Sequence, residues 1–390
     1  MHLVFATSIV PHGAPATGYE IANAAIIDAL RRAGVRVTVL GFTWPGKVAA
    51  DPANTVVLGA VDVRTDSASA LQKLVWSGRS MVEGLTFSSV KVRVISPDEV
   101  RAALQTIEPF DGYVLNSVQF AGAFEAVFDG RPSIFVAHNV EHLSAEENAA
   151  AARSLLQKCL YRREARLLED LERRLCGKAA FVFTLADEDR AALGVAAPGR
   201  SAPLPLVTPA SSYPAPANRS PRYDATLIGT WTWQPNRIGL DWFLEEVSPH
   251  LPKNFRVAIA GNMPSDIRAP HPGVTFVGRV PDAIEFVLGG RVVPLISRAG
   301  SGVQLKTIET FELGLPSVAT SRSLRGIGMI PANCTVADDP IEFARSLLRA
   351  AGSAGDVDPT GFRHEQRMAL DRRIRLGLAA LRHEDERMCA

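Results

Sequence analysis

Short apolar runs alternate with longer segments of helical periodicity along most of the chain, and this alternation occurs twice. In the first half the pattern predicts helices at 18–32 and 145–175, and strands at 2–7, 35–40, 112–116, 133–137 and 179–184. In the second half it predicts an amphipathic helix at 362–383 and strands at 225–229, 255–260, 274–277, 292–295 and 317–320. Apolar strands separated by helices are typical of parallel sheets covered on both faces. The pattern therefore predicts an α/β fold.

Prolines gather between 198 and 221, where they continue neither a helix nor a central strand. The sequence therefore predicts a Rossmann-like domain at 1–207, a linker at 208–223, a second Rossmann-like domain at 224–362 and a helix at 363–390. For that helix, crossing back to the N-terminal domain is one option. Two similar α/β domains imply a central cleft between them, where ligands usually bind.

Composition excludes several classes of protein. The 390 residues are 47% apolar and 21% charged, as in ordinary globular domains, and the net charge of +1 provides no overall field that favours nucleic acid. No apolar run approaches the roughly 20 residues needed to cross a bilayer, and the N-terminus lacks the basic leader of a signal peptide. The four cysteines lack C-x-x-C spacing, which favours reduced thiols in the cytoplasm over disulfides or structural zinc.

One glycine-rich segment, at 300–314, follows a predicted strand and opens a predicted helix. Gly300 and Gly302 would let backbone N–H groups approach an anion at the helix N-terminus, where the macrodipole adds roughly half a positive charge. Gly302, Lys306 and Glu309 are spaced to share one helix face. Lys306 could then neutralise a diphosphate, and Glu309 could accept hydrogen bonds from ribose hydroxyls. The alternative is an exposed ion pair beside an ordinary turn.

This segment, extended to 300–321, resembles GT-B glycosyltransferases of glycosyltransferase family 4, as do 229–247 (GTWTWQPNRIGLDWFLEEV) and 138–141 (HNVE). The resemblance covers nearly the whole chain. It implies that the N-terminal domain binds the acceptor and the C-terminal domain binds the nucleotide sugar. It also implies that Lys306 and Glu309 hold the diphosphate and ribose, and that His138 contacts the transferred sugar.

The resemblance yields a set of candidate residues. The catalytic candidates are His138, Lys306 and Glu309. The donor-binding candidates are Gly13, Gly18, Gly229, Asn236, Arg237, Gly300, Ser301, Gly302 and Val303. Trp231 and Trp233 either shape the cleft or are packing residues.

The resemblance implies that the protein transfers a sugar from a UDP- or GDP-sugar to a saccharide or lipid-linked acceptor. It also implies a role in cell-surface polysaccharide or glycoconjugate synthesis. The sequence shows no evident acidic metal cluster, so we expect neither a metal nor a cofactor. The family often carries two acids eight positions apart, but Ser301 stands where the first would be, eight residues before Glu309. This departure leaves retention of configuration open, and it keeps a non-catalytic assembly partner as an alternative. A non-hydrolysing sugar-nucleotide epimerase, which would share the fold, is another.

Three further patterns have competing interpretations. His138, Glu141 and His142 match an H-x-x-E-H zinc motif, but the predicted strand before them places the group in a loop. The loop at 11–18 lacks G-x-G-x-x-G, which disfavours a dehydrogenase. The stretch 153–178 carries eight basic and four acidic residues with leucines at helical spacing. It is either an ordinary solvated helix or one that rests on anionic lipid at the inner face of the membrane.

Overall fold

The computed structural model describes residues 1–389 apart from 16, 66–67, 153, 214–218 and 354. The chain divides into two compact units, of which unit 1 comprises 1–204 and 369–390 and unit 2 comprises 205–368. The predicted boundary after 207 lies close to this division. The predicted linker begins inside unit 2, where the Thr208 backbone N–H and hydroxyl donate to the buried carboxylate of Glu312.

Unit 1 is built on a parallel sheet of seven strands in the order β3-β2-β1-β4-β5-β6-β7, counted over the described residues. The strands are β1 (His2–Ile9), β2 (Arg36–Thr43), β3 (Thr55–Ala60), β4 (Gly112–Asn116), β5 (Ser133–Ala137), β6 (Phe181–Thr184) and β7 (Ser201–Pro203). The helices are α1 (Gly18–Arg32), α2 (Ala70–Glu83), α3 (Phe87–Val92), α4 (Pro97–Gln105), α5 (Val118–Ala123), α6 (Glu141–Ala151), α7 (Leu155–Lys178) and α8 (Asp187–Ala192). This strand order is that of dinucleotide-binding folds, in which ligands bind beyond the carboxyl ends of the strands.

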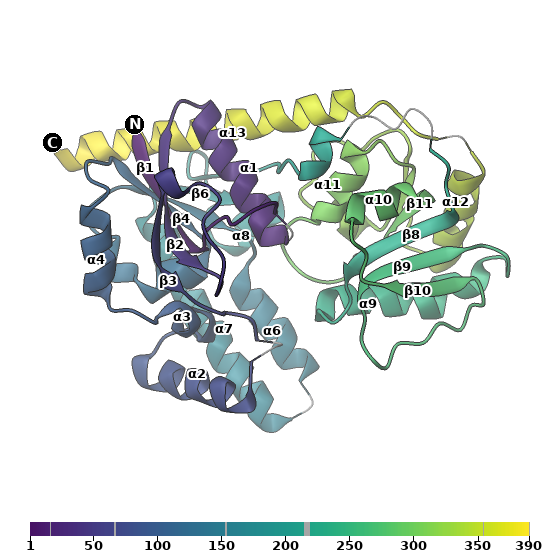
Figure 1. The fold of residues 1–390 in the computed structure, drawn as a ribbon, viewed down its shortest axis with the longest axis horizontal. Helices are drawn as coiled ribbons and strands as arrows, with labels where there is room; N and C mark the ends of the chain where they lie inside the picture. Colours follow the sequence, from purple (N-terminus) through teal and green to yellow (C-terminus); the bar gives the residue numbers. More distant parts are fainter. Residues whose placement is uncertain (16, 66–67, 153, 214–218, 354, 390) are drawn as a thin grey trace. The chain divides into compact units, whose positions relative to one another are not determined.

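Unit 2 repeats the plan with a parallel sheet in the order β10-β9-β8-β11-β12-β13, of which Figure 1 labels β8 to β11. Its strands are β8 (Tyr223–Thr230), β9 (Val257–Asn262), β10 (Val274–Gly278), β11 (Gly290–Leu295), β12 (Ser317–Ala319) and β13 (Cys334–Val336). Its helices are α9 (Gln234–Trp242), which continues as a π-helical turn over Phe243–Val247, α10 (Ala283–Leu288), α11 (Leu305–Glu312) and α12 (Pro340–Gly352). The predicted α/β fold with two Rossmann-like halves is confirmed.

The last helix, α13 (Thr360–Cys389), begins in unit 2, and its residues from Ala369 onward belong to unit 1. In unit 1, Asp371 forms an ion pair with Arg32 of α1 at 2.7 Å. A Cβ added at Gly377 would lie 2.5 Å from the Phe183 ring, so the helix packs directly on this aromatic ring of β6.

The prediction of one helix at 145–175 is wrong, because the structure has α6 and α7 with a break between them. Ala152 and Ser154 adopt extended backbone conformations, with ψ of 134° and 138°. Neither glycine nor proline marks this break in the sequence, so the apolar periodicity runs through it. The strands β3, β7 and β13 were not predicted; each lies at an edge of its sheet, and β7 contains a proline counted toward the linker.

Close packing of α9 on the end of β11 gives a stability prediction. A Cβ at Gly239 would come within 2.2 Å of the Ile296 carbonyl oxygen, which is backbone and cannot rotate away. Gly239→Ala should therefore lower the free energy of unfolding by about 1–3 kcal/mol in chemical denaturation. The control is Gly78→Ala on α2, where an added Cβ meets nothing within 4 Å and should be neutral or stabilising. Equal unfolding free energies for the two variants would contradict this packing.

Candidate functional site

A buried hydrogen-bond network lies in unit 1 where β1, β4 and β5 end. Its centre is Asn116, whose Nδ2 lies 2.7 Å from Asn23 Oδ1, 3.2 Å from Tyr19 OH and 3.3 Å from Thr7 Oγ1. His138 follows β5 directly, and its Nε2 lies 2.8 Å from Asn116 Oδ1. The predicted candidate His138 therefore lies in a loop at a strand's carboxyl end, held by residues from three other elements.

The network determines the protonation state of His138. Because Asn116 Nδ2 faces three oxygen atoms, its Oδ1 faces the imidazole, so His138 Nε2–H donates and Nδ1 carries no proton. Burial lowers the pKa of His138 to about 4, so the ring is neutral at pH 7. Nδ1 has no hydrogen-bond partner among the described residues, and it could accept a hydrogen bond from a ligand hydroxyl.

The other two members of the H-x-x-E-H motif do not join His138. Glu141 and His142 begin α6, and the buried Glu172 of α7 accepts hydrogen bonds from both of their backbone N–H groups. His142 Nδ1 lies 2.6 Å from Glu172 Oε2, whereas the His138 ring bonds to Asn116. Over the part of the chain that the structure describes, no group of three or more His, Cys, Asp or Glu side chains could hold a metal ion.

In unit 2, α11 is fixed on its inner face by buried contacts. Ile308 and Phe311 are at most 1% exposed, and Phe311 packs edge-on against Phe362. Thr307 Oγ1 donates to the Ser323 carbonyl at 2.8 Å. Glu312, at the end of the helix, accepts hydrogen bonds from Thr208, and burial raises the pKa of its carboxyl to about 7. Lys306 and Glu309 are left on the partly exposed side.

Lys306 lies in the first turn of α11 over a buried aromatic ring. Its Nζ is 5.4 Å from the centroid of Trp231, whose indole N–H donates to the Ala260 carbonyl at 2.8 Å. Burial lowers the pKa of Lys306 to about 8, although the charge of Glu309 opposes this. Burial also raises the pKa of Glu309 to about 7, against the charge of Lys306. Lys306 forms no ion pair within the described residues, so this cation lacks a bonded counter-charge.

The glycine-rich loop before α11 has two turns that require glycine. Gly300 and Gly302 are buried and adopt φ values of 91° and 74°, which L side chains rarely take. Gly302 lies outside the helix, which begins at Leu305, so the prediction that it shares a helix face with Lys306 and Glu309 is wrong. Ser301 and Val303 lie beside these glycines, both partly buried. The α11 N-cap makes no side-chain hydrogen bond and its first turn has no acid, which leaves backbone N–H groups for an anion.

The remaining candidates of unit 2 lie around the end of β8. A Cβ at Gly229 would be 3.1 Å from the Trp231 ring, so this glycine makes room for the residue under Lys306. Trp231 is 1% exposed and packs in the core, whereas Trp233 is 49% exposed. Asn236 Nδ2 donates to the Thr230 carbonyl at 3.1 Å.

Arg237 is already occupied by two carboxylates, Asp241 at 2.6 Å and Asp266 at 2.9 Å. Its positive charge is therefore already neutralised by protein carboxylates in this structure. In unit 1, Gly13 adopts a φ of 131° in an exposed loop. Gly18 is the first residue of α1, after a capping box made by Thr17 and Glu20.

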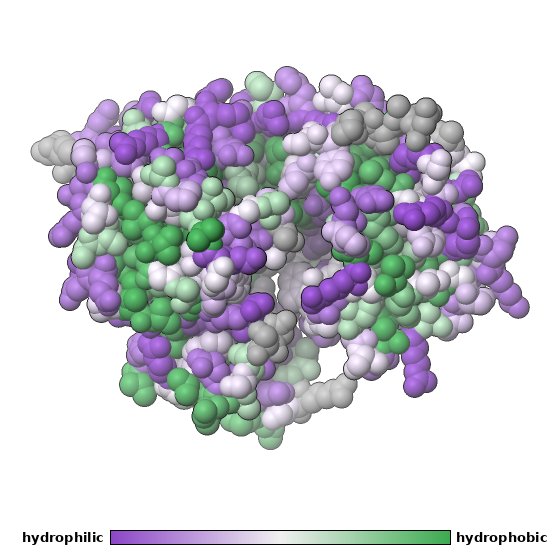
Figure 2. All heavy atoms as spheres, viewed as in Figure 1, coloured by the Kyte–Doolittle hydropathy of each residue, from purple (hydrophilic) through white to green (hydrophobic). Residues whose placement is uncertain are grey.

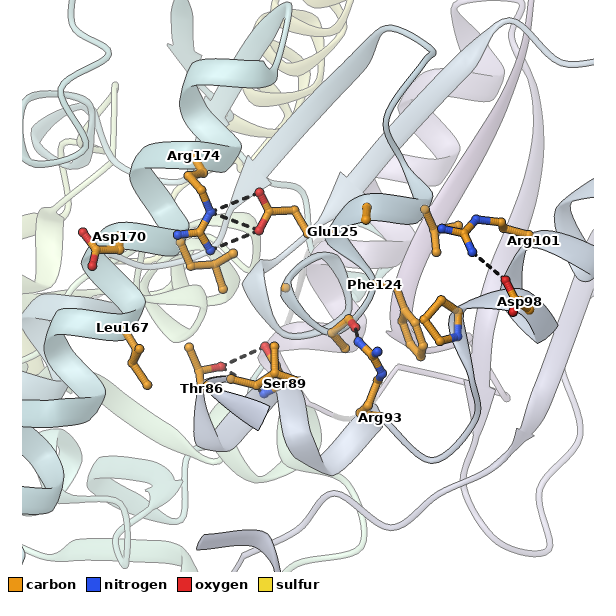
Figure 3. Close-up of a pocket in the computed structure, with 18 residues that line it drawn as sticks. Thr86, Ser89, Arg93, Asp98, Arg101, Phe124, Glu125, Leu167, Asp170 and Arg174 are labelled. Carbon is orange, nitrogen blue, oxygen red and sulfur yellow. Dashed lines mark hydrogen bonds and ion pairs between the residues drawn. The ribbon is translucent and has the colours of Figure 1, made fainter. Parts of the chain in front are cut away.

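Sequence reasoning missed the residues that hold His138. Tyr19 and Asn23 lie four positions apart in α1, and Asn23 is a fully buried amide on an otherwise apolar face, which is a usable signal. Unit 1 also contains a cavity of about 380 Å³ away from all the candidates. Among its charged residues, Arg174 pairs with Glu125 and Arg101 with Asp98 (Figure 3), and Arg93 donates to the Ala123 carbonyl. We therefore assign it no ligand.

Comparison with solved structures finds this fold in glycosyltransferases. Sucrose-phosphate synthase from Thermosynechococcus elongatus aligns with a TM-score of 0.65 and 14% identity, over 100% of this chain and 99% of that one. HepE of Anabaena, in complex with UDP-glucose, aligns with a TM-score of 0.60 and 13% identity, over 97% and 100%. WaaG, a glycosyltransferase involved in lipopolysaccharide biosynthesis, has a TM-score of 0.59 and 17% identity, over 97% and 98%. These likenesses show the GT-B fold.

Residues 223–352 match the family model described as Glycosyl transferases group 1. The matched range runs from β8 to α12 and includes α11 with Lys306 and Glu309. A comparison with curated protein sequences finds no match. The narrower assignment to family 4 stays a prediction.

The neutral state of His138 can be measured by NMR titration of its ring protons, assigned through the loss of signal in His138→Gln. We expect an apparent pKa near 4. Asn116→Asp would place a carboxylate beside Nε2, so it should raise that pKa by about 1–3 units. Asn254→Asp, at an exposed position of unit 2, is the control and should leave the pKa of His138 unchanged. Titration of the wild-type ring near its usual value of about 6.5 would contradict the buried hydrogen bond.

Proposed function

We propose that this chain, which has the GT-B fold and matches the Glycosyl transferases group 1 model over 223–352, is a glycosyltransferase that moves a sugar from a UDP- or GDP-linked donor to a saccharide or lipid-linked acceptor without a metal ion. Unit 2 would bind the donor and unit 1 the acceptor. In the reaction the bond between the anomeric carbon and the diphosphate breaks, and its electron pair stays on the phosphate oxygen. A new bond forms to an acceptor oxygen, whose hydroxyl proton is released.

The observation that carries this proposal is the unpaired cation at the start of α11. Departure of the nucleoside diphosphate builds negative charge on its oxygens, so a fixed positive group stabilises that charge. Lys306 is partly desolvated over the Trp231 ring, and the adjoining helix N-terminus has no side-chain cap. Glu309 lies one turn further along the same helix, where its carboxylate would accept ribose hydrogen bonds. Such a fixed cation would serve in place of a metal ion.

His138 would contact the transferred sugar in unit 1. Its neutral imidazole, with Nδ1 unprotonated, suits it to accept a hydrogen bond from a sugar hydroxyl rather than to donate a proton. We further propose that the transfer retains configuration and that the protein acts in the cytoplasm, in cell-surface polysaccharide or glycoconjugate synthesis. Ser301, in place of a first acid, favours the second candidate, a non-catalytic GT-B protein that has lost donor turnover.

Lys306→Ala should lower nucleotide release from UDP- or GDP-sugars by roughly a hundredfold to a thousandfold, because it removes the cation opposite the leaving group. Lys253→Ala, at an exposed lysine of the same unit, is the matched control and should leave turnover unchanged. Melting temperatures of both variants check the fold. Turnover by Lys306→Ala at the wild-type rate would contradict the assignment. Absence of both turnover and UDP or GDP binding in the wild type would favour the non-catalytic protein.

Affinity for UDP or GDP should depend on pH through two groups. Below about 7 Glu309 gains a proton and becomes a weaker acceptor, and above about 8 the empty site loses the positive charge of Lys306. Binding measured by calorimetry should therefore be tightest between these values, falling on both sides. Glu309→Gln should abolish the acidic limb only, and Lys306→Arg should abolish the basic limb only. A profile with no limb in this range would show that neither group contacts the nucleotide.

A further inference from the structure

Helix α2 in unit 1 exposes a continuous apolar stripe. Its large apolar residues recur at helical spacing on one side and are highly exposed: Leu71 (71%), Leu74 (69%), Val75 (46%) and Val82 (88%). Met81, at the edge of this stripe, is 54% exposed. An amphipathic helix normally buries such a stripe against its own protein, so this helix is turned outward.

The outward orientation is fixed by contacts on the opposite side of α2. Trp76 is 6% exposed and packs edge-on against Phe87, with ring centroids 5.9 Å apart. The buried Ser80 donates to the Leu85 carbonyl at 2.7 Å. Its own hydroxyl and carbonyl oxygens accept hydrogen bonds from Arg163 of α7 at 3.0 and 2.7 Å. The helix cannot roll to bury its stripe without breaking these contacts.

The first turns of α7 extend the apolar surface. Leu155 and Leu156 are 81% and 69% exposed, and Leu160 is 36% exposed. Figure 2 shows green spheres along the lower edge of the molecule, where Figure 1 places α2 and the beginning of α7. We call the exposed apolar residues of α2 and of the start of α7 the apolar face.

The two segments that carry the apolar face are basic. Residues 68–82 and 154–163 contain Lys73, Arg79, Lys158, Arg162 and Arg163, and no acid. Lys73, Lys158 and Arg162 form no ion pair with any residue that the structure describes. Arg79 pairs with Glu83 at the end of α2. Exposed leucines and valines flanked by unpaired cations are the features of a segment that lies in the surface of an anionic bilayer.

We propose that the apolar face docks on an anionic lipid bilayer, with α2 in the plane of the interface and the cations of α7 against the headgroups. A second copy of this chain fits the apolar face less well. A two-fold contact through this face would bring the same positive segments together, and these segments would repel each other. Over the described residues, no helix is long and apolar enough to span a membrane. This proposal does not depend on the donor site of unit 2.

Co-sedimentation of the full chain with vesicles tests the docking. The wild type should bind vesicles of phosphatidylglycerol and phosphatidylcholine, and bind more weakly as salt rises. The triple variant Leu71→Ser, Leu74→Ser and Val82→Ser should lower the partition coefficient at least about tenfold, because it removes the inserted side chains. Lys158→Gln with Arg162→Gln should weaken binding to the mixed vesicles but not to phosphatidylcholine alone.

The matched controls are Leu376→Ser and Ile341→Ser, which remove exposed apolar residues of α13 and α12 and should bind as the wild type does. Circular dichroism and melting temperatures verify that every variant is folded. Wild-type protein that stays in the supernatant would overturn the proposal, and so would a triple variant that binds like the wild type. A dimer in sedimentation equilibrium that the triple variant dissociates would identify a second copy as the occupant instead.

Discussion

Burial of one face of α11 is the constraint on which the candidate donor site depends. The buried side of α11 packs into unit 2 through Thr307, Ile308, Phe311 and Glu312. Because this side is fixed, Lys306 and Glu309 lie on the other side of the helix. The helix is also held at its end, where Glu312 accepts hydrogen bonds from Thr208 and Arg363 donates to the Glu312 carbonyl. The backbone that carries the Lys306 cation is therefore held in place. Such preorganisation makes electrostatic stabilisation of a transition state effective.

In unit 1, His138 is held in place by hydrogen bonds rather than by the packing of apolar side chains. Asn116 connects β4 with residues of α1 and β1, and it determines which nitrogen of His138 carries the proton. Both units thus position one partly desolvated polar group at the carboxyl ends of their strands. In His138 burial favours the neutral form, whereas Lys306 keeps a pKa of about 8 and stays largely charged at pH 7. The neutral imidazole of His138 suits a sugar hydroxyl, and the charged ammonium of Lys306 suits a diphosphate.

The sequence predicts elements well where local signals are strong. The helix Gly18–Arg32 and the strands Gly112–Asn116 and Ser133–Ala137 have the predicted bounds, because turn residues or caps flank clear apolar patterns. The break between α6 and α7 carries no such signal. The glycines at the start of the segment 300–314 were correctly placed before a helix, but the start of that helix at Leu305 depends on backbone geometry at Gly302.

Tertiary features could be predicted only in part. Lys306 and Glu309 lie on one helix, so their spacing predicted that they lie together, whereas the network around His138 joins residues more than ninety positions apart. That network forms because β1 pairs with β4, and strand order cannot be read from apolar periodicity. The exposed stripe of α2 was likewise not predicted, since periodicity alone does not tell which side of a helix faces the protein.

A crystal structure of the protein soaked with UDP or GDP in the presence of EDTA tests the account most directly. We predict density for the diphosphate at the first turn of α11, with a phosphate oxygen within hydrogen-bond distance of Lys306 Nζ and of backbone N–H groups near Gly302. The ribose hydroxyls should lie against the Glu309 carboxylate. A diphosphate bound elsewhere, or one that contacts α11 only through a metal ion, would contradict the account.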